Sequence, residues 1–141
     1  MSYTDTFILV SADCPATCGE IPQGRGGVET LPMIEHELLT RHPYHFTEKE
    51  LIFAKHVRQR GISAKEVSQN RETIWSGLFQ KPHPCLRASQ LPKRYGWGVH
   101  YDSKGRIAIF AVESKEYAAF TKGNASGPKL VPAMRNKRVP K

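Results

Sequence analysis

Residues 95–112 read Y-G-W-G-V-H-Y-D-S-K-G-R-I-A-I-F-A-V, a pattern typical of two strands joined by a tight turn. Asp102 opens the turn, and Gly105 stands where a left-handed backbone is needed. The residues on either side of the turn are mostly β-branched, aromatic or small. This stretch therefore predicts an antiparallel hairpin on which a sheet is built.

The register of this hairpin follows from the length of its turn. A loop of residues 102–105 gives the pairs Tyr101–Arg106, Val99–Ala108, Trp97–Phe110 and Tyr95–Val112. One face is then apolar and aromatic, and we expect Trp97 to be buried against Phe110. The opposite face carries Gly96, Gly98, His100, Ile107, Ile109 and Ala111.

The rest of the chain adds one strand and several helices. Residues 6–12 form a nearly all-apolar run that predicts a buried N-terminal strand. Capping residues predict helices over residues 30–42, 47–60, 63–79 and 114–120. Residues 51–60 also alternate as a strand would, but cations followed by Gly61 favour a helix. The order predicts an α+β fold, with a small antiparallel sheet of the hairpin and the N-terminal strand packed against helices.

The length of 141 residues predicts one globular domain, 1–128, followed by a basic tail, 129–141. The tail holds five of the 21 Lys and Arg residues and no acid, which leaves 16 bases against the chain's 13 acids elsewhere. We expect a solvated terminus; an arm that grips phosphates is the alternative. Whether this tail is ordered stays open.

No apolar run is long enough to span a membrane, and residues 1–12 do not resemble a signal peptide. The three cysteines are an odd number, which favours free thiols in a reducing compartment. We therefore expect a cytoplasmic protein with no membrane partner.

A cationic segment precedes and enters the hairpin. Residues 82–100 contain three Lys or Arg residues and no carboxylate, and arginine forks suit carboxylate or phosphate groups. We expect an anionic small molecule or peptide to bind here, with Cys85-Leu86-Arg87 extended as a strand. The candidate binding residues are Arg87, Ser89, Lys93, Arg94, Gly96, Gly98 and His100. In the alternative, a helix packs on the glycines and Arg87 pairs with an internal acid, Glu113 first.

An enzyme is the second hypothesis, in which Cys85 or His100 acts together with Arg87. A cation beside a thiol stabilises the nucleophilic thiolate. Free cysteines are more often buried apolar residues, which favours an inert Cys85. The third hypothesis is an interaction protein whose basic tail engages nucleic acid or an acidic partner. No nucleic-acid-reading motif is present, so nucleic acid is the less favoured partner.

No metal site or cofactor is predicted. Cys14, Cys18, His83 and Cys85 have the residue types of a zinc site, but His83 and Cys85 point to opposite sides of an extended segment. The glutamate pairs Glu35/Glu37 and Glu48/Glu50 lie at helix starts, where capping explains them. Nucleotide-binding glycine patterns and hydrolase motifs are missing.

Several segments resemble a known family. They are P-C-L-R-A-S-x-L-x-K-R-Y-G-W-G-x-H over 84–100, V-E-S-x-E-Y over 112–117 and A-M-R-x-K-R over 133–138. The N-terminal D-T-F-I, D-C-P and E-I-P segments fit as well. Together they resemble a widespread set of small microbial proteins that share a domain of unknown function. The resemblance covers nearly the whole chain and implies no reaction, substrate or cofactor; Cys18 departs from its pattern.

Overall fold

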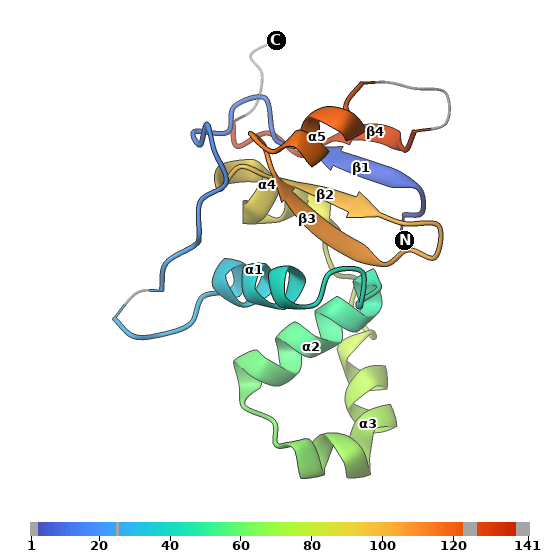
Figure 1. The fold of residues 1–141 in the computed structure, drawn as a ribbon. Helices are drawn as coiled ribbons and strands as arrows, with labels where there is room; N and C mark the ends of the chain where they lie inside the picture. The colour runs from blue at the N-terminus through green and yellow to red at the C-terminus, as the bar shows by residue number, and fades with distance from the viewer. Residues whose placement is uncertain (1–2, 25, 123–126, 138–141) are drawn as a thin grey trace.

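The computed structural model describes residues 3–24, 26–122 and 127–137 and confirms the α+β fold (Figure 1). The strands are β1 (Thr6–Leu9), β2 (Trp97–Tyr101), β3 (Ile107–Ala111) and β4 (Lys129–Pro132). The helices are α1 (Leu31–Arg41), α2 (Glu48–Arg60), α3 (Ala64–Leu78), α4 (Gln90–Arg94) and α5 (Lys115–Phe120), with a 3-10 turn, η1, over Leu86–Ala88. The expected helix over residues 51–60 is therefore confirmed.

The sheet has the strand order β3-β2-β1-β4, and it is mixed rather than antiparallel. β1 pairs antiparallel with β2 but parallel with β4. The first residues of the expected tail are thus an edge strand, because the apolar Leu130 and Val131 lie beside Phe7 and Ile8. Residues 138–141 of that tail lie outside the described residues.

The hairpin forms as expected, but its register differs by one residue. Asp102 pairs with Arg106 through a backbone bond of 2.9 Å, and its carboxylate accepts the backbone N–H groups of Lys104 and Arg106 at 2.9 and 2.8 Å. The loop is therefore shorter than the four residues assumed from the sequence. As a result Trp97 lies opposite Ala111, not opposite Phe110.

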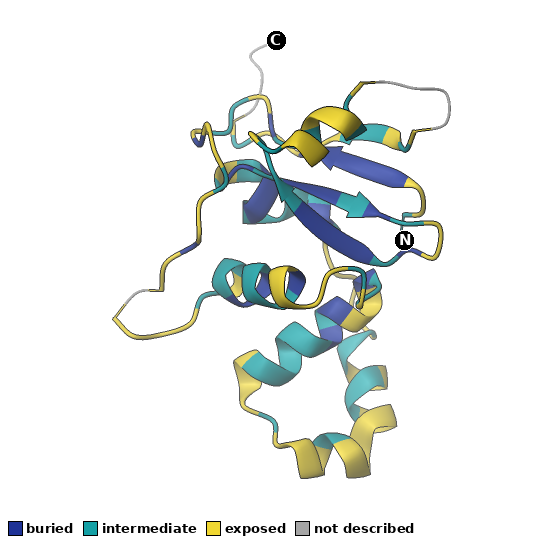
Figure 2. Ribbon diagram, viewed as in Figure 1, coloured by how far each residue is buried: buried dark blue, intermediate teal, exposed yellow. Residues whose placement is uncertain are grey.

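The corrected register puts the aliphatic residues of β3 on the main core face. Val99, Tyr101 and Ile107 are fully buried there, on the face that packs against α1 and α2 (Figure 2). Phe110 lies on the other face, where its ring packs against Phe120 of α5 with centroids 5.3 Å apart. Trp97 is only half-buried and packs edge-on against His36 at 4.9 Å, so its expected burial against Phe110 is wrong.

Local capping explains where the helices begin. Thr47 and Glu50 form a reciprocal capping box at the start of α2, as their spacing indicates. Thr30, Ser63 and Ser114 each accept a backbone N–H at the starts of α1, α3 and α5. α1 and α2 lie below the sheet, α5 lies above it, and α3 extends away from it (Figure 1).

Candidate functional site

The predicted cationic segment folds as two short turns rather than as a strand. Leu86 is buried within η1, and Ser89 caps α4 by accepting the Leu91 N–H at 3.1 Å. The apolar C-L-R-A-S run was therefore misinterpreted as extended, although the N-cap serine three residues after Leu86 was a signal for a helix start.

Arg87 has a backbone partner, and the acid considered as its alternative partner, Glu113, does not contact it. Its Nε donates to the carbonyl of Pro132 at 2.8 Å, and its own carbonyl accepts the Met134 N–H at 2.9 Å. Glu113 lies elsewhere and accepts the Gly19 N–H at 2.8 Å. Arg87 thus anchors the end of β4, and the proposed Arg87–Glu113 pair is not formed.

Lys93 and Arg94 lie beside the C-terminal segment, and Asn136 links them. Its side-chain oxygen accepts from Arg94 Nε at 3.2 Å, and its side-chain nitrogen donates to the Lys93 carbonyl at 2.9 Å. The Asp13 carboxylate holds the segment by accepting the backbone N–H groups of Asn136 and Lys137, each at 3.0 Å. The Ser11 hydroxyl and these N–H groups lower the pKa of Asp13 far below its ordinary value.

This arrangement brings four basic residues to the contact between α4 and the C-terminal segment. We define the α4 basic surface as Lys93, Arg94, Arg135 and Lys137. Among the described residues, the ion pairs involve Arg41, Lys55, Arg58 and Arg106, and none of the four side chains of this surface. The Asp13 carboxylate lies at this surface and accepts from the Ser11 hydroxyl, the Asn136 side chain and the backbone N–H groups of Asn136 and Lys137.

The two glycines of the predicted site are covered by the protein itself. A Cβ at Gly96 would overlap the carbonyl oxygen of Cys18, and one at Gly98 would overlap the rings of Phe7 and Tyr117. Since Tyr117 belongs to α5, a helix does pack on Gly98. Glycine permits another group to lie close to the backbone, and at these two positions that group belongs to the protein itself.

His100 faces away from the α4 basic surface. It lies on the α5 side of β2, where its ring stacks on Phe120 at 4.3 Å and its Nδ1 hydrogen-bonds with the Tyr44 hydroxyl at 2.8 Å. Burial lowers the pKa of His100, which favours the neutral ring. The structure therefore does not bring His100 together with Arg87 or Cys85.

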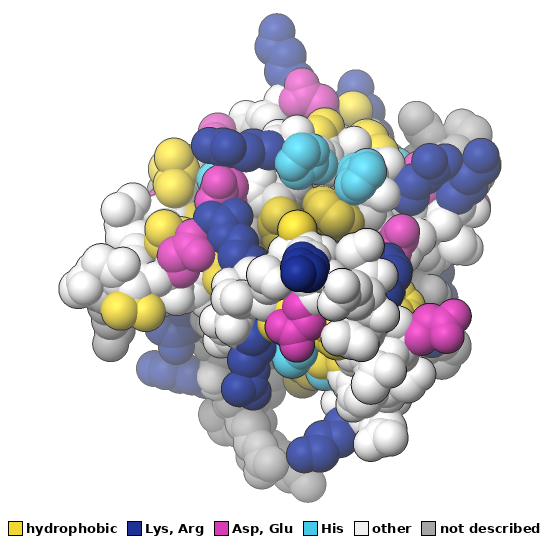
Figure 3. All heavy atoms as spheres, turned by 90° about the horizontal axis from the view of Figure 1, so that it is seen from below, with side chains coloured by type: hydrophobic (Ala, Val, Ile, Leu, Met, Phe, Trp, Pro, Cys, Tyr) yellow, Lys and Arg dark blue, Asp and Glu magenta, His cyan; other side chains and the backbone are white. Residues whose placement is uncertain are grey.

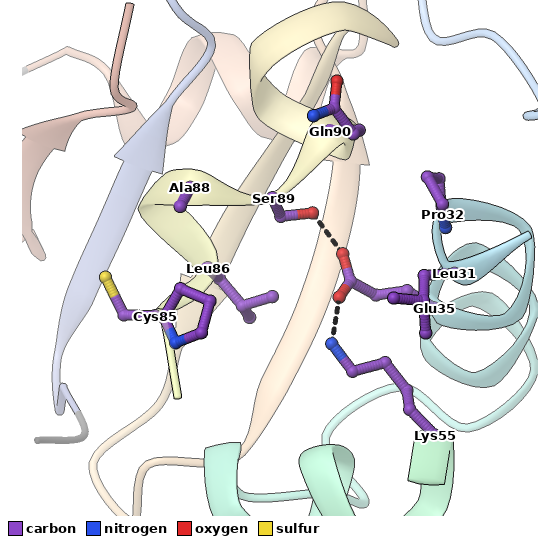
Figure 4. Close-up of a pocket in the computed structure, with 10 residues that line it drawn as sticks. Leu31, Pro32, Glu35, Lys55, Cys85, Leu86, Ala88, Ser89 and Gln90 are labelled. Carbon is purple, nitrogen blue, oxygen red and sulfur yellow. Dashed lines mark hydrogen bonds and ion pairs between the residues drawn. The ribbon is translucent and has the colours of Figure 1, made fainter. Parts of the chain in front are cut away.

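Ser89 takes part in a buried polar cluster rather than in an anion site (Figure 4). Glu35 of α1 accepts from Lys55 Nζ of α2 at 2.6 Å and from the Ser89 hydroxyl at the start of α4. The Glu35 side chain is 6% exposed and the Lys55 side chain 20% exposed. The cluster lines a cavity of about 230 Å³ and ties three helices together.

Cys85 lines the same cavity, but its sulfur points away from Glu35 and Lys55 (Figure 4). The Cys85 thiol and the Arg87 guanidinium both act on the ionisation of Tyr3. Burial raises the pKa of Tyr3, Cys85 acts in the same direction, and Arg87 opposes them. Of the residues that the enzyme hypothesis needs, Cys85 directly precedes η1 and Arg87 lies within it.

Glu48 is a second buried carboxylate. Its Oε1 accepts from the Tyr101 hydroxyl at 3.0 Å and from the Leu86 N–H at 3.2 Å, and burial raises its pKa. Both Glu35 and Glu48 were interpreted as helix-start acids. Glu35 precedes the buried Leu39 by four residues, and Glu48 precedes the buried Leu51 by three. Residues at these spacings share one face of a helix, so the sequence did contain a signal that both glutamates face inward.

The model of a family of unknown function (DUF6157) matches residues 1–139. The chain belongs to this family. No curated protein and no solved structure matches the chain. Membership in DUF6157 assigns no reaction or ligand, so the geometry of the site carries the functional argument.

Three further observations concern metal ligands, membrane-spanning helices and thiols. Within residues 3–24, 26–122 and 127–137, no group of three or more His, Cys, Asp or Glu side chains is arranged to hold a metal ion. In the same ranges, no helix has the length and apolar character required to cross a bilayer. All three cysteines are free thiols.

Glu48 should make the unfolding free energy depend on pH. Its pKa is raised in the folded state, so it favours folding below its ordinary pKa of 4.5 and loses that contribution as pH rises through the raised value. Glu48→Gln keeps an acceptor for Tyr101 and cannot ionise. We expect the variant to gain stability relative to the wild type as pH rises from 4 to 7, in urea titrations at each pH. Glu116→Gln, at an exposed position on α5, is the control; a gain that shrinks with pH would contradict the assignment.

Proposed function

We propose that this protein binds an anionic small molecule or peptide through the α4 basic surface. The observation that supports this most strongly is the fixation of two distant segments by Asp13 and Asn136, which sets Lys93 and Arg94 beside Arg135 and Lys137. A solvated tail needs no such anchoring. The segment is held by hydrogen bonds that leave the basic side chains on the outside.

Arg94 is suited to recognise an oxyanion. Its Nε bonds to Asn136, which orients the guanidinium while its terminal nitrogens make no hydrogen bond to the described residues. Those nitrogens form the fork that matches a carboxylate or a phosphate. Arg87 contacts the same segment at Pro132 and Met134, so it extends the basic surface toward β4.

The proposal predicts a specific response to inorganic pyrophosphate. In two-dimensional ¹H–¹⁵N NMR titrations, the amides of residues 93–94 and 135–137 should shift together. Lys93→Glu with Arg94→Glu should weaken binding by about tenfold or more, because charge-assisted hydrogen bonds contribute roughly 1.5–3 kcal/mol each.

The matched control changes the same net charge on another face, with Lys115→Glu and Lys122→Glu, both at exposed positions. The control should retain the affinity of the wild type. An equal loss in both double variants would mean that pyrophosphate responds only to net charge, and the proposed site would be wrong.

A second candidate function rests on the position of Cys85 and Arg87, two residues apart at the 3-10 turn η1. In that alternative, Cys85 is a nucleophile and Arg87 stabilises its thiolate or the charge of a substrate. Cys18 is exposed and serves as an internal reference for thiol accessibility. Alkylation of Cys85 by iodoacetamide at neutral pH faster than that of Cys18 would favour the enzyme.

A further inference from the structure

Three cavities on the helical side of the molecule join into one groove. The cavity beside Glu35 and a second one of about 190 Å³ share Leu31, Lys55 and Pro84. The second and a third, of about 540 Å³, share His56, Leu78 and His83. We call this continuous depression the α2–α3 groove. It runs from the start of α4 along α2 to the C-terminal part of α3.

The groove has an apolar floor. Its aliphatic lining residues are Leu31, Ile52, Ile62, Ile74 and Leu78. Leu31 is 46% exposed, and α3 has no fully buried residue, so this apolar surface is incompletely covered by the described chain. Helices of a globular protein usually bury their apolar stripe, which marks this face as a docking surface.

Basic side chains line the groove mainly along α2 and the segment after α3. They are Lys55, His56, Arg60, Lys81 and His83. The single acid among the lining residues is Glu35, which is already bound by Lys55 and Ser89. Figure 3 views the molecule from below and shows exposed hydrophobic and His side chains surrounded by Lys and Arg side chains, with Asp and Glu side chains among them.

We propose that the α2–α3 groove binds an acidic, amphipathic peptide segment of a partner protein. Apolar side chains of the segment contact the aliphatic floor, and its carboxylates face the basic side chains. Ile52 and Arg60 lie eight residues apart on α2, which is about 12 Å along the helix axis. The α2 part alone therefore accommodates about four residues of an extended peptide.

Other occupants fit the same surface less well. A fatty acid needs a cation at one end of an apolar channel, whereas here Lys55 and Arg60 lie at different points along the groove. A second copy of this chain would bring together two molecules of net charge +8. Nucleic acid offers phosphates but little for an aliphatic floor.

The experiment uses a fluorescein-labelled peptide of alternating Leu and Glu, about ten residues long, and fluorescence anisotropy. The wild type should bind it and should not bind the corresponding Leu–Lys or Ser–Glu peptides. Arg60→Glu with Lys81→Glu should weaken binding about tenfold, since both are exposed groove residues whose charge is reversed. Ile74→Ala should weaken binding about threefold by reducing the apolar floor.

The matched control is Lys65→Glu with Lys104→Glu, which makes the same change of charge at exposed positions outside the groove. This control and Lys93→Glu/Arg94→Glu should both bind the Leu–Glu peptide as the wild type does. Arg60→Glu/Lys81→Glu should in turn keep pyrophosphate binding, so the two proposals fail separately.

Three results would overturn the groove proposal. The first is equal binding of the Leu–Lys peptide. The second is tighter binding of oleate at the same residues, which would identify a lipid site. The third is a concentration-dependent dimer in sedimentation velocity that Ile74→Ala dissociates, which would assign the groove to a second copy.

Discussion

Glu35→Ala should lower the free energy of unfolding by about 3–5 kcal/mol, measured by urea denaturation at pH 7. The substitution leaves the Lys55 ammonium and the Ser89 hydroxyl without the carboxylate that accepts from both. The Lys55 side chain is only 20% exposed, so water replaces the lost partner incompletely. The three helices that Glu35 connects also lose their common contact.

The double variant Glu35→Leu/Lys55→Met separates this cause from a simple packing effect. Buried ion pairs can often be replaced by apolar residues of similar volume at little cost, so the double variant should recover most of the lost stability. A loss in the double variant as large as in Glu35→Ala would show that the carboxylate stabilises the fold through another contact. Glu66→Ala, at an exposed position of α3, should change stability by less than about 0.5 kcal/mol.

Elements that depend on neighbouring residues could be predicted from the sequence. The capping residues Thr47 and Ser114 mark helix starts within three residues of the groups they bind, and the hairpin turn is equally local. β4 could not be predicted in this way. It is a four-residue strand that ends in Pro132, and it is stabilised by parallel pairing with β1 at the other end of the chain.

The candidate site shows the same division between local and distant contacts. Lys93 and Arg94 are adjacent in the sequence, so their shared charge was visible. Their setting depends on Asn136, whose contact with Asp13 joins residues 123 positions apart. The predicted hairpin register was wrong because of hydrogen bonds within the turn itself. The Asp102 carboxylate accepts two N–H groups within the turn, and the Asp102 backbone N–H donates to the Arg106 carbonyl, which shortens the loop.

The glycines of the predicted site did not reveal what packs against them. Glycine before a strand is compatible with a ligand, a backbone or a side chain close to the sheet, and the sequence does not distinguish these. The structure places residues 16–20 over the start of β2. Trp97 Nε1 donates to the Glu20 carbonyl and the Glu20 N–H to the Tyr95 carbonyl, each at 2.8 Å. Residues 16–20 therefore occupy the space in which we expected a ligand.

Gly96→Ala should therefore destabilise the protein by about 2–5 kcal/mol in urea denaturation. Gly96 has a φ of +78°, which costs an alanine roughly 1–2 kcal/mol, and overpacking against the Cys18 carbonyl adds about 1–3 kcal/mol. Gly61→Ala is the matched control, because Gly61 also has a positive φ, +64°, with nothing within 4 Å of an added Cβ. The additional loss of unfolding free energy in Gly96→Ala, relative to Gly61→Ala, then measures the steric cost of an added Cβ between the loop and the sheet. Equal losses in the two variants would mean that the loop yields freely, and the start of β2 would again be open to an anionic ligand.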